Sequence, residues 1–186
     1  MSDSQFYSRR GDDGYTGILG PGRVPKDDMR PEAYGTVDEA QAALGLVRAS
    51  DCTSRTDEIL LAVQREMYLL MAELAAVGDL NSPFAGQVTA AHVEQLEAWI
   101  AGVEAQIDVP REFVVPGDSR PGAALHLART IVRRAERSAV RLHHGRLMEN
   151  DQVVRYLNRL SSLLFVLALF EDQASTGKGA TLAKDE

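Results

Sequence analysis

The sequence predicts an all-α protein, a bundle of five helices, from three observations. Apolar residues recur at intervals of three and four over most of the chain after residue 32. No stretch shows the alternation of apolar and polar residues that is typical of a half-buried strand. The chain has 186 residues, of which 45% are hydrophobic, so it is long enough for one well-cored domain and short for two.

Five apolar series mark the expected helices, each with its hydrophobic residues along one face. In chain order they are Ala33, Val37, Ala40, Leu44 and Val47; Leu60, Val63, Met67, Leu70, Leu74 and Val77; Val93, Leu96, Ile100, Val103 and Ile107; Leu125, Ala128, Val132, Ala135, Ala139 and Leu142; Val153, Leu157, Leu160, Leu164 and Leu167. Ser119, followed by Pro121 in the first turn, predicts the start of the fourth helix, and Asn150 is a suitable N-cap for the fifth. Loops are expected at residues 79–86 and 108–122.

Composition divides the chain into three regions. Residues 1–30 are expected to form a flexible N-terminal segment, residues 31–173 the bundle, and residues 174–186 a mobile tail. No apolar run approaches the roughly 20 residues of a membrane helix, and the N-terminus lacks the apolar core of a secretory signal. We therefore expect a cytoplasmic protein with no membrane partner. The net charge of -7 argues against a general nucleic-acid binder.

Positive charge is concentrated in one predicted helix. The segment 120–146 contains seven arginines and a single acid, Glu136. Arg129, Arg133 and Arg137 stand four residues apart and therefore share a helix face, where like charges cost about 0.2–0.5 kcal/mol per pair. Something anionic is expected to compensate them.

Two interpretations of this arginine face remain open. It can be a solvated basic face, partly neutralised by Glu136 and by Asp38 and Glu39 on a neighbouring helix, as most charge runs are. It can also be a polyphosphate site, because the guanidinium fork matches the geometry of phosphate oxygens.

The stretch YSRRGDDGYTGILGPGRVPKDD, residues 7–28, interleaves cations, carboxylates and flexible glycine backbone. Anion-binding loops have this composition, because backbone N–H groups can approach the anion closely where no side chain intervenes. The stretch is therefore either a frayed terminus or the lid of a polyphosphate site on the arginine face.

Three further side chains have both a structural and a functional interpretation. His126, beside Leu125, is interpreted as a core histidine with its hydrogen bonds satisfied; no Glu-x-x-His pair accompanies it, so a di-iron bundle is not expected. Phe113, in a Pro-flanked loop, can plug the end of the bundle. Asn158, inside the last helix, can cap a neighbouring backbone or face a ligand.

In their order along the chain, these motifs resemble those of the PduO-type ATP:cob(I)alamin adenosyltransferases. The resemblance runs from about Tyr7 to Phe170. The motifs that carry it are RRGDDGYTG, PKDD, EAYGTVDEAQAALG, FVVPG, ALHLARTIVRRAER and YLNRLSSLLFVLA. The resemblance implies a five-helix bundle that assembles as a homotrimer, with ATP bound between neighbouring subunits and a corrinoid beside it.

The reaction implied by the resemblance is transfer of the 5'-deoxyadenosyl group of ATP to cob(I)alamin, with release of triphosphate. Because Co(I) is itself a strong nucleophile, no protein nucleophile or general base is required, and the sequence offers no such constellation. The expected cofactors are ATP as co-substrate, Mg²⁺ with the triphosphate, and cobalamin as substrate. The expected partners are a flavoprotein reductase and an adenosylcobalamin-dependent mutase.

The resemblance also assigns roles to individual residues, and it leaves the ligands of a metal unknown. The residues expected to bind ATP are Ser8, Arg10, Gly11, Asp12, Gly14, Lys26, Glu32, Arg133, Glu136, Arg137 and Asn158. Phe113 and Val114 are expected to bind the corrinoid, and Phe113 is expected to pack under the corrin and displace its lower axial ligand. The expected catalytic set is Arg133, Asp38 and Phe113, with Asp38 and Arg133 paired between subunits.

One departure from the family pattern leaves an alternative open. Where the family typically reads Thr-Arg-Thr-Gly-Asp, this chain reads Ser8-Arg9-Arg10-Gly11-Asp12, so Arg10 replaces a phosphate-binding threonine. A non-catalytic trimeric carrier or sensor that binds ATP or a corrinoid is therefore the second hypothesis. A structural bundle with a solvated basic face is the third.

Overall fold

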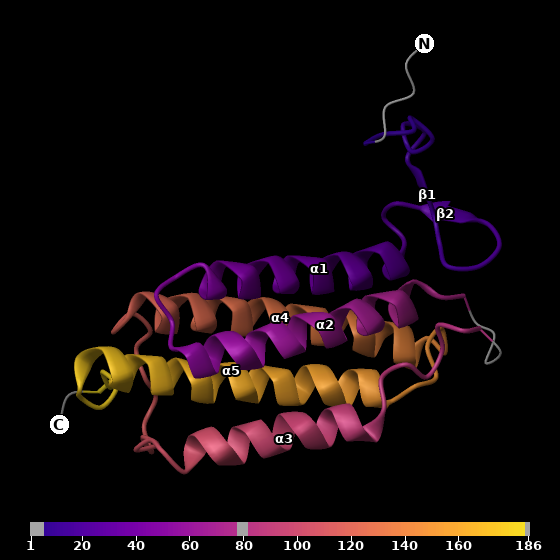
Figure 1. The fold of residues 1–186 in the computed structure, drawn as a ribbon. Helices are drawn as coiled ribbons and strands as arrows, with labels where there is room; N and C mark the ends of the chain where they lie inside the picture. The colour runs from indigo at the N-terminus through magenta and orange to yellow at the C-terminus, as the bar shows by residue number, and fades with distance from the viewer. Residues whose placement is uncertain (1–5, 78–81, 185–186) are drawn as a thin grey trace.

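The computed structural model describes residues 6–77 and 82–184. Five helices dominate this part of the chain: α1 (Met29–Arg48), α2 (Ser54–Ala75), α3 (Ala90–Glu104), α4 (Arg120–His144) and α5 (Gln152–Thr176). Helix α4 packs against both α1 and α5, α2 packs against α1, and α3 lies on the outside of α5 (Figure 1). The predicted all-α fold with five helices is confirmed.

The predicted apolar series form the core of this bundle. Val37, Leu70, Val132 and Leu160, from four different series, are fully buried in one continuous cluster. Each buried side chain of this size contributes about 1.5–3 kcal/mol relative to its exposed form, so the facing stripes fix how the helices pack.

Helix α2 ends two residues before the last member of its predicted series, Val77. The guanidinium of Arg30 is buried at this end and donates hydrogen bonds to the carbonyls of Leu74 and Ala76. These carbonyls are therefore satisfied without a further helical turn. Similarly, α3 ends at Glu104, before the predicted Ile107.

Helix α1 begins at Met29, earlier than the periodicity predicted. The carboxylate of Asp28 accepts a hydrogen bond of 3.0 Å from the backbone N–H of Arg30 and caps the helix, and Pro31 falls in the first turn, where its missing N–H costs nothing. The first helix thus starts inside the predicted N-terminal segment, residues 1–30, of which residues 1–5 lie outside the described part of the chain.

Ser119 is the N-cap of α4 as predicted, because its Oγ accepts a hydrogen bond of 2.9 Å from the Gly122 N–H. The prediction of Asn150 as the N-cap of α5 is wrong by one residue, since Asp151 occupies that position without a side-chain cap. Asn150 instead accepts a 3.1 Å bond from the Gln152 N–H, and its amide donates to the carboxylate of Glu73 at 2.8 Å.

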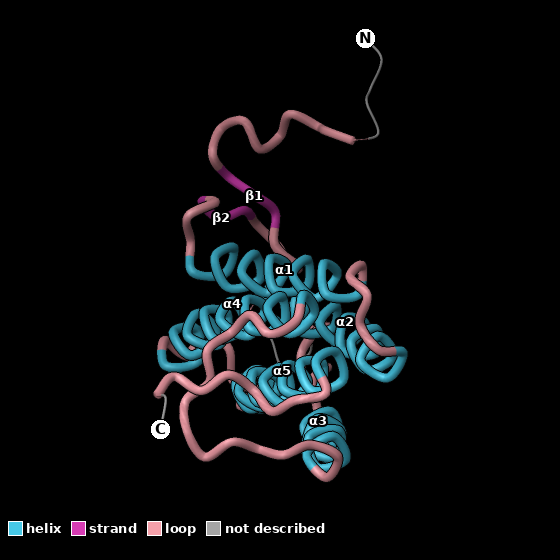
Figure 2. Tube along the Cα trace, turned by 90° about the vertical axis from the view of Figure 1, so that its left-hand side faces the viewer, coloured by secondary structure: helices cyan, strands magenta, loops and turns pink. Residues whose placement is uncertain are grey.

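A small antiparallel sheet, β1 (Tyr15–Gly17) with β2 (Arg23–Pro25), corrects the prediction of no strands. The hairpin stands above the end of the bundle at which α1 begins (Figures 1 and 2). Leu19 joins it to the bundle: its N–H donates to the Ala75 carbonyl and its carbonyl accepts from the Val77 N–H, both at 3.0 Å. Strands of three residues are too short to show a periodic pattern.

Helix α5 corrects the prediction that no apolar run approaches the length of a membrane helix. Among the described residues, it is long and apolar enough to span a membrane by length and composition alone. However, 61% of its apolar window is buried inside the bundle, as in the core helix of a soluble protein. It extends to Thr176, past the predicted domain boundary at residue 173.

The structure describes the second predicted loop, residues 108–122, in full, and the first predicted loop and the tail in part. Residues 79–81 of the first loop, and residues 185–186 of the tail, lie outside the described residues. The tail was expected to be mobile, but residues 181–183 lie against the second loop, with Val114 and Leu182 paired in an antiparallel bridge.

Candidate functional site

Arg23 organises the turn that follows Arg10. Its guanidinium makes two hydrogen bonds to the carboxylate of Asp13, at 2.8 and 2.7 Å, and donates to the carbonyls of Arg10 and Tyr15. The hydrogen bonds from Arg23, and then that from the backbone N–H of Tyr15, lower the pKa of Asp13. The turn is therefore held by a bidentate ion pair rather than by buried apolar surface.

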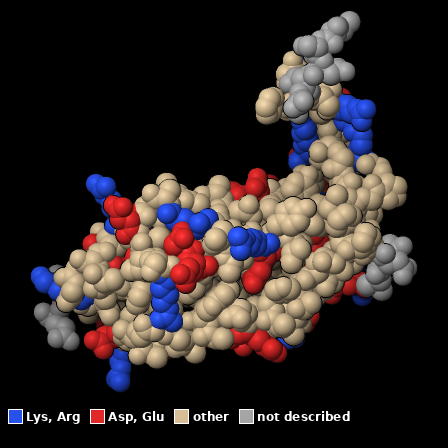
Figure 3. Space-filling model, viewed as in Figure 1, with Lys and Arg blue, Asp and Glu red and all other residues tan. Residues whose placement is uncertain are grey.

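The glycines of this turn lie beside Lys26. Gly14 adopts φ 82°, which favours glycine, and its N–H donates to the Gly11 carbonyl at 3.2 Å. The Lys26 N–H donates to the Gly14 carbonyl at 2.9 Å, and a Cβ at Gly11 would lie 3.0 Å from Lys26 Nζ. The lysine amine thus covers Gly11, beside the exposed Ser8 and Asp12, and Lys and Arg side chains gather on this segment (Figure 3).

A second group of predicted residues meets where α4 packs on α5. The amide of Asn158 donates to Glu136 Oε1 at 3.0 Å and its Oδ1 accepts from Arg159 at 2.8 Å, so both ends of the amide are oriented. Arg133, about one turn before Glu136, and Arg137, directly after it, are exposed, and the Arg137 guanidinium donates to the Arg133 carbonyl at 3.1 Å. The face therefore presents two cations beside an ordered carboxylate–amide pair.

The positive charge of this face is only partly compensated within the chain. Glu39 pairs with Arg134, as the solvated-face interpretation expects, but among the described residues Arg133 and Arg137 form no ion pair. Burial, and then the charge of Arg133, lower the pKa of Arg129, whose Nε is buried without a hydrogen-bond partner. This part of the face has the electrostatic character of an anion site.

The two groups of predicted residues do not meet within one chain. In the described part of the chain, residues 7–27 make their hydrogen bonds within the segment, to Asp28 or, through Leu19, to Ala75 and Val77, and the hairpin projects from the bundle (Figure 2). Glu32 is exposed in the first turn of α1, next to this segment. The predicted pair between Asp38 and Arg133 involves two subunits, and it stays a prediction.

Phe113 does not plug the end of the bundle, so the structural interpretation of this residue is wrong. Its side chain is 87% exposed, on a loop whose backbone is hydrogen-bonded to the C-terminal tail. Val114, beside it, is half-buried. A large aromatic side chain exposed on an ordered loop is suited to contact a ligand.

His126 is buried as predicted, at 4% exposure, but it is not satisfied. Its ring meets Phe165 edge-on, with centroids 5.8 Å apart, and neither ring nitrogen has a hydrogen-bond partner in the described chain. Burial and the charge of Arg129 lower its pKa, so the neutral imidazole is favoured. Within residues 6–77 and 82–184, no group of three or more His, Cys, Asp or Glu is placed to hold a metal ion.

Sequence reasoning missed two residues beside these groups. Arg23, which holds the N-terminal turn, directly follows Gly20-Pro21-Gly22, and this position after a glycine-rich turn was the signal available. Phe165 lies under the Arg129 guanidinium, 6.0 Å from ring centroid to Cζ, but its place in the apolar run of residues 163–167 gave no sign of this contact.

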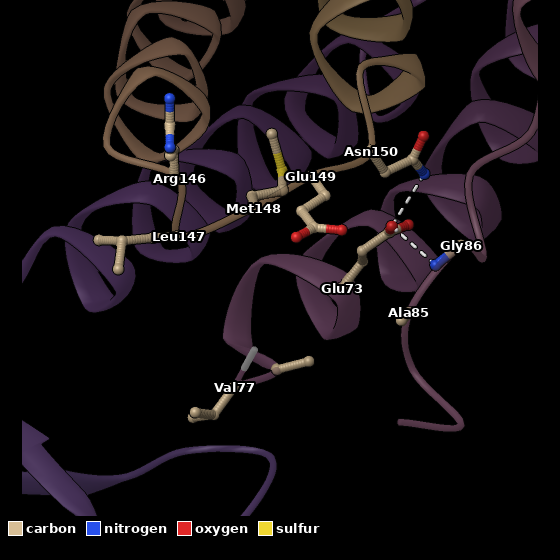
Figure 4. A pocket seen from close by; sticks show the side chains of 10 residues that line it. Glu73, Val77, Ala85, Gly86, Arg146, Leu147, Met148, Glu149 and Asn150 are labelled. Atoms are coloured by element: carbon tan, nitrogen blue, oxygen red, sulfur yellow. Dashed lines mark hydrogen bonds between the residues drawn. The ribbon is translucent and has the colours of Figure 1, made fainter. Parts of the chain in front are cut away.

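A cavity of about 290 Å³ lies at the hairpin end of the bundle (Figure 4). It is lined by Glu73, Ala76, Val77, Ala85, Gly86, Arg146, Leu147, Met148, Glu149 and Asn150. The Glu73 carboxylate accepts hydrogen bonds of 2.8 Å from the Gly86 N–H and from Asn150, so it ties the ends of three elements together (Figure 4). None of the predicted site residues lines this cavity.

The fold and these two groups define a class of protein, a helical bundle with a glycine–lysine turn and a partly compensated arginine face, both suited to an anionic ligand. A family model described as "Cobalamin adenosyltransferase" matches residues 6–171. The chain therefore belongs to the cobalamin adenosyltransferase family.

Individual relatives agree with this assignment. The chain is 38% identical to a corrinoid adenosyltransferase of Citrobacter freundii over 90% of its own length and 95% of that protein. It is 37% identical to the corrinoid adenosyltransferase PduO of Salmonella typhimurium, again over 90% of this chain, but it spans only 49% of that longer protein. A variant PduO-type ATP:corrinoid adenosyltransferase from Lactobacillus reuteri, complexed with cobalamin and ATP, superposes with a TM-score of 0.87 and 29% identity, covering 97% of this chain and 100% of that one.

Proposed function

We propose that this protein transfers the 5'-deoxyadenosyl group of ATP to cob(I)alamin, giving adenosylcobalamin and triphosphate. The observation that carries the proposal is the exposed face of α4, where Arg133 and Arg137 have no ion pair within the described chain and flank the hydrogen-bonded Glu136 and Asn158. A triphosphate leaving group needs such donors, whereas a structural bundle does not.

In this reaction the protein has to position the two substrates and to neutralise the charge of the triphosphate. The electron pair of Co(I) forms the bond to C5' of the ribose, the C5'–O bond breaks, and triphosphate leaves with that electron pair. The charge that develops on the leaving oxygen is stabilised by fixed cations, for which Arg133, Arg137 and the Lys26 amine over Gly11 are suited. No proton transfer to a side chain is required.

The corrinoid is proposed to bind against Phe113 and Val114. The exposed phenylalanine ring offers apolar surface in place of the lower axial ligand of cobalt, and loss of that ligand makes the reduction of Co(II) to Co(I) easier. The exposure of this side chain and the order of its loop support the assignment.

The active form is proposed to be a homotrimer, with the site completed between neighbouring copies. Two observations support this assembly. The N-terminal hairpin projects from the bundle (Figure 2), and within the described residues no hydrogen bond joins it to α4. Leu46 on α1 and Leu127 on α4 are 59% and 54% exposed, on helices that pack together. An ion pair between Asp38 of one copy and Arg133 of the next would then replace water around both groups.

The remaining components follow from the reaction. Mg²⁺ prefers oxygen ligands and is usually held by substrate phosphates with one or two carboxylates, and the exposed carboxylate of Asp12 in the Gly11–Gly14 turn suits this role. A flavoprotein reductase is proposed to supply the electron, and an adenosylcobalamin-dependent mutase to accept the product, in the cytoplasm.

The proposal is tested by incubating the purified protein with reduced cobalamin, ATP and Mg²⁺. We expect adenosylcobalamin, followed by its absorption spectrum, and one triphosphate released for each molecule formed. Binding of ATP and cobalamin without triphosphate would favour the carrier or sensor. A melting temperature that does not rise with ATP and Mg²⁺ would favour the structural bundle.

A further inference from the structure

The loop between α3 and α4, which carries Phe113, is fixed at both ends by the last turns of α5. At its start, the Gln173 amide donates to the Asp108 carbonyl at 2.9 Å and accepts from the Asp108 N–H at 3.3 Å. At its end, Ser119 Oγ donates to the buried carboxylate of Asp172 at 2.6 Å. These contacts set the two ends of the loop but do not reach its middle.

The middle of the loop is held by the C-terminal tail. After α5 the chain turns at Gly177, whose φ of 65° favours glycine, and it returns along the loop. The Val115 N–H donates to the Thr181 carbonyl at 2.8 Å, and the Ala183 N–H donates to the Phe113 carbonyl at 2.7 Å. We call residues 181–183 the strap.

A side chain of the loop fixes the register of the strap. The two carboxylate oxygens of Asp118 accept hydrogen bonds from the backbone N–H and the hydroxyl of Thr181, both at 2.7 Å. The same two bonds lower the pKa of Asp118. Because Asp118 precedes the α4 cap Ser119, it connects the strap to the rigid start of that helix.

We propose that the strap, through the pair formed by Asp118 and Thr181, positions Phe113 for the corrinoid step. The inference rests on the proposed function and adds two positioning residues to it. The Phe113 side chain is 87% exposed, so packing does not fix its direction and the loop backbone must. A misplacement of about 1 Å at a reacting centre can cost on the order of 100-fold in rate. Binding of ATP, on the arginine face, does not depend on the strap.

Two truncations of the full-length protein test the inference. Ending the chain at Thr176 removes the strap, whereas ending it at Ala183 keeps it, so the second truncation is the matched control. We expect the first to lower kcat/KM for cob(I)alamin by about tenfold or more, with the ATP KM within about twofold of the wild type. Amide hydrogen exchange of loop residues 113–118 should become faster in the first truncation only. Equal loop exchange or equal corrinoid kinetics in the two truncations would overturn the inference.

Point variants separate positioning from folding. Thr181→Val removes one hydrogen bond to Asp118, and Asp118→Ala removes both, at a part-exposed position where little stability is lost. Both should reduce the fraction of four-coordinate Co(II)balamin seen with bound ATP, the double variant should be no worse than Asp118→Ala, and melting temperatures should barely change. Kinetics and Co(II) spectra like those of the wild type would refute the role of the pair. A wild type that makes no adenosylcobalamin would instead refute the proposed function.

Discussion

Replacement of Phe113 by alanine should leave the fold almost intact. The side chain is 87% exposed, so of the about 200 Å² of a phenylalanine only about 25 Å² is covered by the rest of the chain. At about 25 cal/mol per Å², the variant loses about 0.6 kcal/mol of stability. For a chain of this size, that corresponds to a fall in melting temperature of about 1–3 °C.

The kinetic effect of Phe113→Ala should be much larger than the effect on stability. If the ring becomes buried against the corrin, its transfer from water contributes about 1.5–3 kcal/mol, which corresponds to about 10- to 200-fold in kcat/KM for cob(I)alamin. The ATP KM should hardly change, because the substitution acts on cobalt coordination and not on phosphate binding. Adenosylcobalamin formation at varied corrinoid and varied ATP measures both values.

The exposed Val109, which lies in the same loop, offers a matched control. Val109→Ala trims a smaller apolar side chain, 46% exposed, on the same loop, and we expect kinetics close to those of the wild type. Four-coordinate Co(II)balamin in the Phe113→Ala variant at the level of the wild type would contradict the role of the ring. A fall in melting temperature well above 3 °C would contradict the loop geometry on which the estimate of about 1–3 °C rests.

Three other predictions concern charged and titratable groups. Arg137→Lys keeps the charge but loses the bidentate fork, so ATP use should weaken strongly at an unchanged melting temperature; unchanged kinetics would remove Arg137 from the site. Arg10→Thr should raise the ATP KM and weaken inhibition by triphosphate, because a charge-assisted contact of about 1.5–3 kcal/mol is exchanged for a neutral one of about 1 kcal/mol; activity that appears only in this variant would favour the carrier or sensor. The pKa of His126 is lowered from the usual 6.5, so the unfolded state binds the proton more strongly, and stability should be full above pH 6.5 and fall below it. In the His126→Leu variant, the free energy of unfolding measured with denaturant should change less with pH between pH 5 and about 6.5. An unchanged pH dependence would exclude this histidine as the cause of the loss of stability.

Much of the fold was predictable, because a helix with one apolar face has apolar residues at intervals of three and four in the sequence. The series containing Leu70, Val132 and Leu160 became core, and Ser119 with Pro121 marked the start of α4 because capping is a local property. The hairpin at residues 15–25 was not predictable, since it depends on the ion pair between Arg23 and Asp13 rather than on a pattern.

The candidate site was predictable in its local parts and not in its long-range ones. Spacing alone placed Arg133 and Arg137 on one helix face, and packing of α4 on α5 then added the contact between Glu136 and Asn158. The contact between the C-terminal tail and the loop could not be predicted, because it joins two short segments, about 65 residues apart, through backbone hydrogen bonds that any sequence can make.

The environment of Arg129 bears on the two interpretations of the arginine face and yields a last prediction. A solvated basic face keeps its guanidinium groups in water, whereas burial lowers the pKa of Arg129, and its Nε has no hydrogen-bond partner in the described chain. The neighbouring charge of Arg133 adds repulsion at this point, which a bound anion would relieve. Arg129→Met keeps the apolar contact with Phe165 and removes the charge.

This variant should therefore melt about 1 °C higher than the wild type without ligand, since about 0.2–0.5 kcal/mol of repulsion is removed. Its melting temperature should also rise less with ATP and Mg²⁺ than that of the wild type, because the anion no longer relieves the same repulsion. Thermal melts at low and high salt measure both effects, and salt should shrink the difference between the two proteins. An Arg129→Met protein that is less stable than the wild type without ligand, but stabilised equally by ATP, would show that Arg129 is a structural residue and that the anion site lies elsewhere on α4.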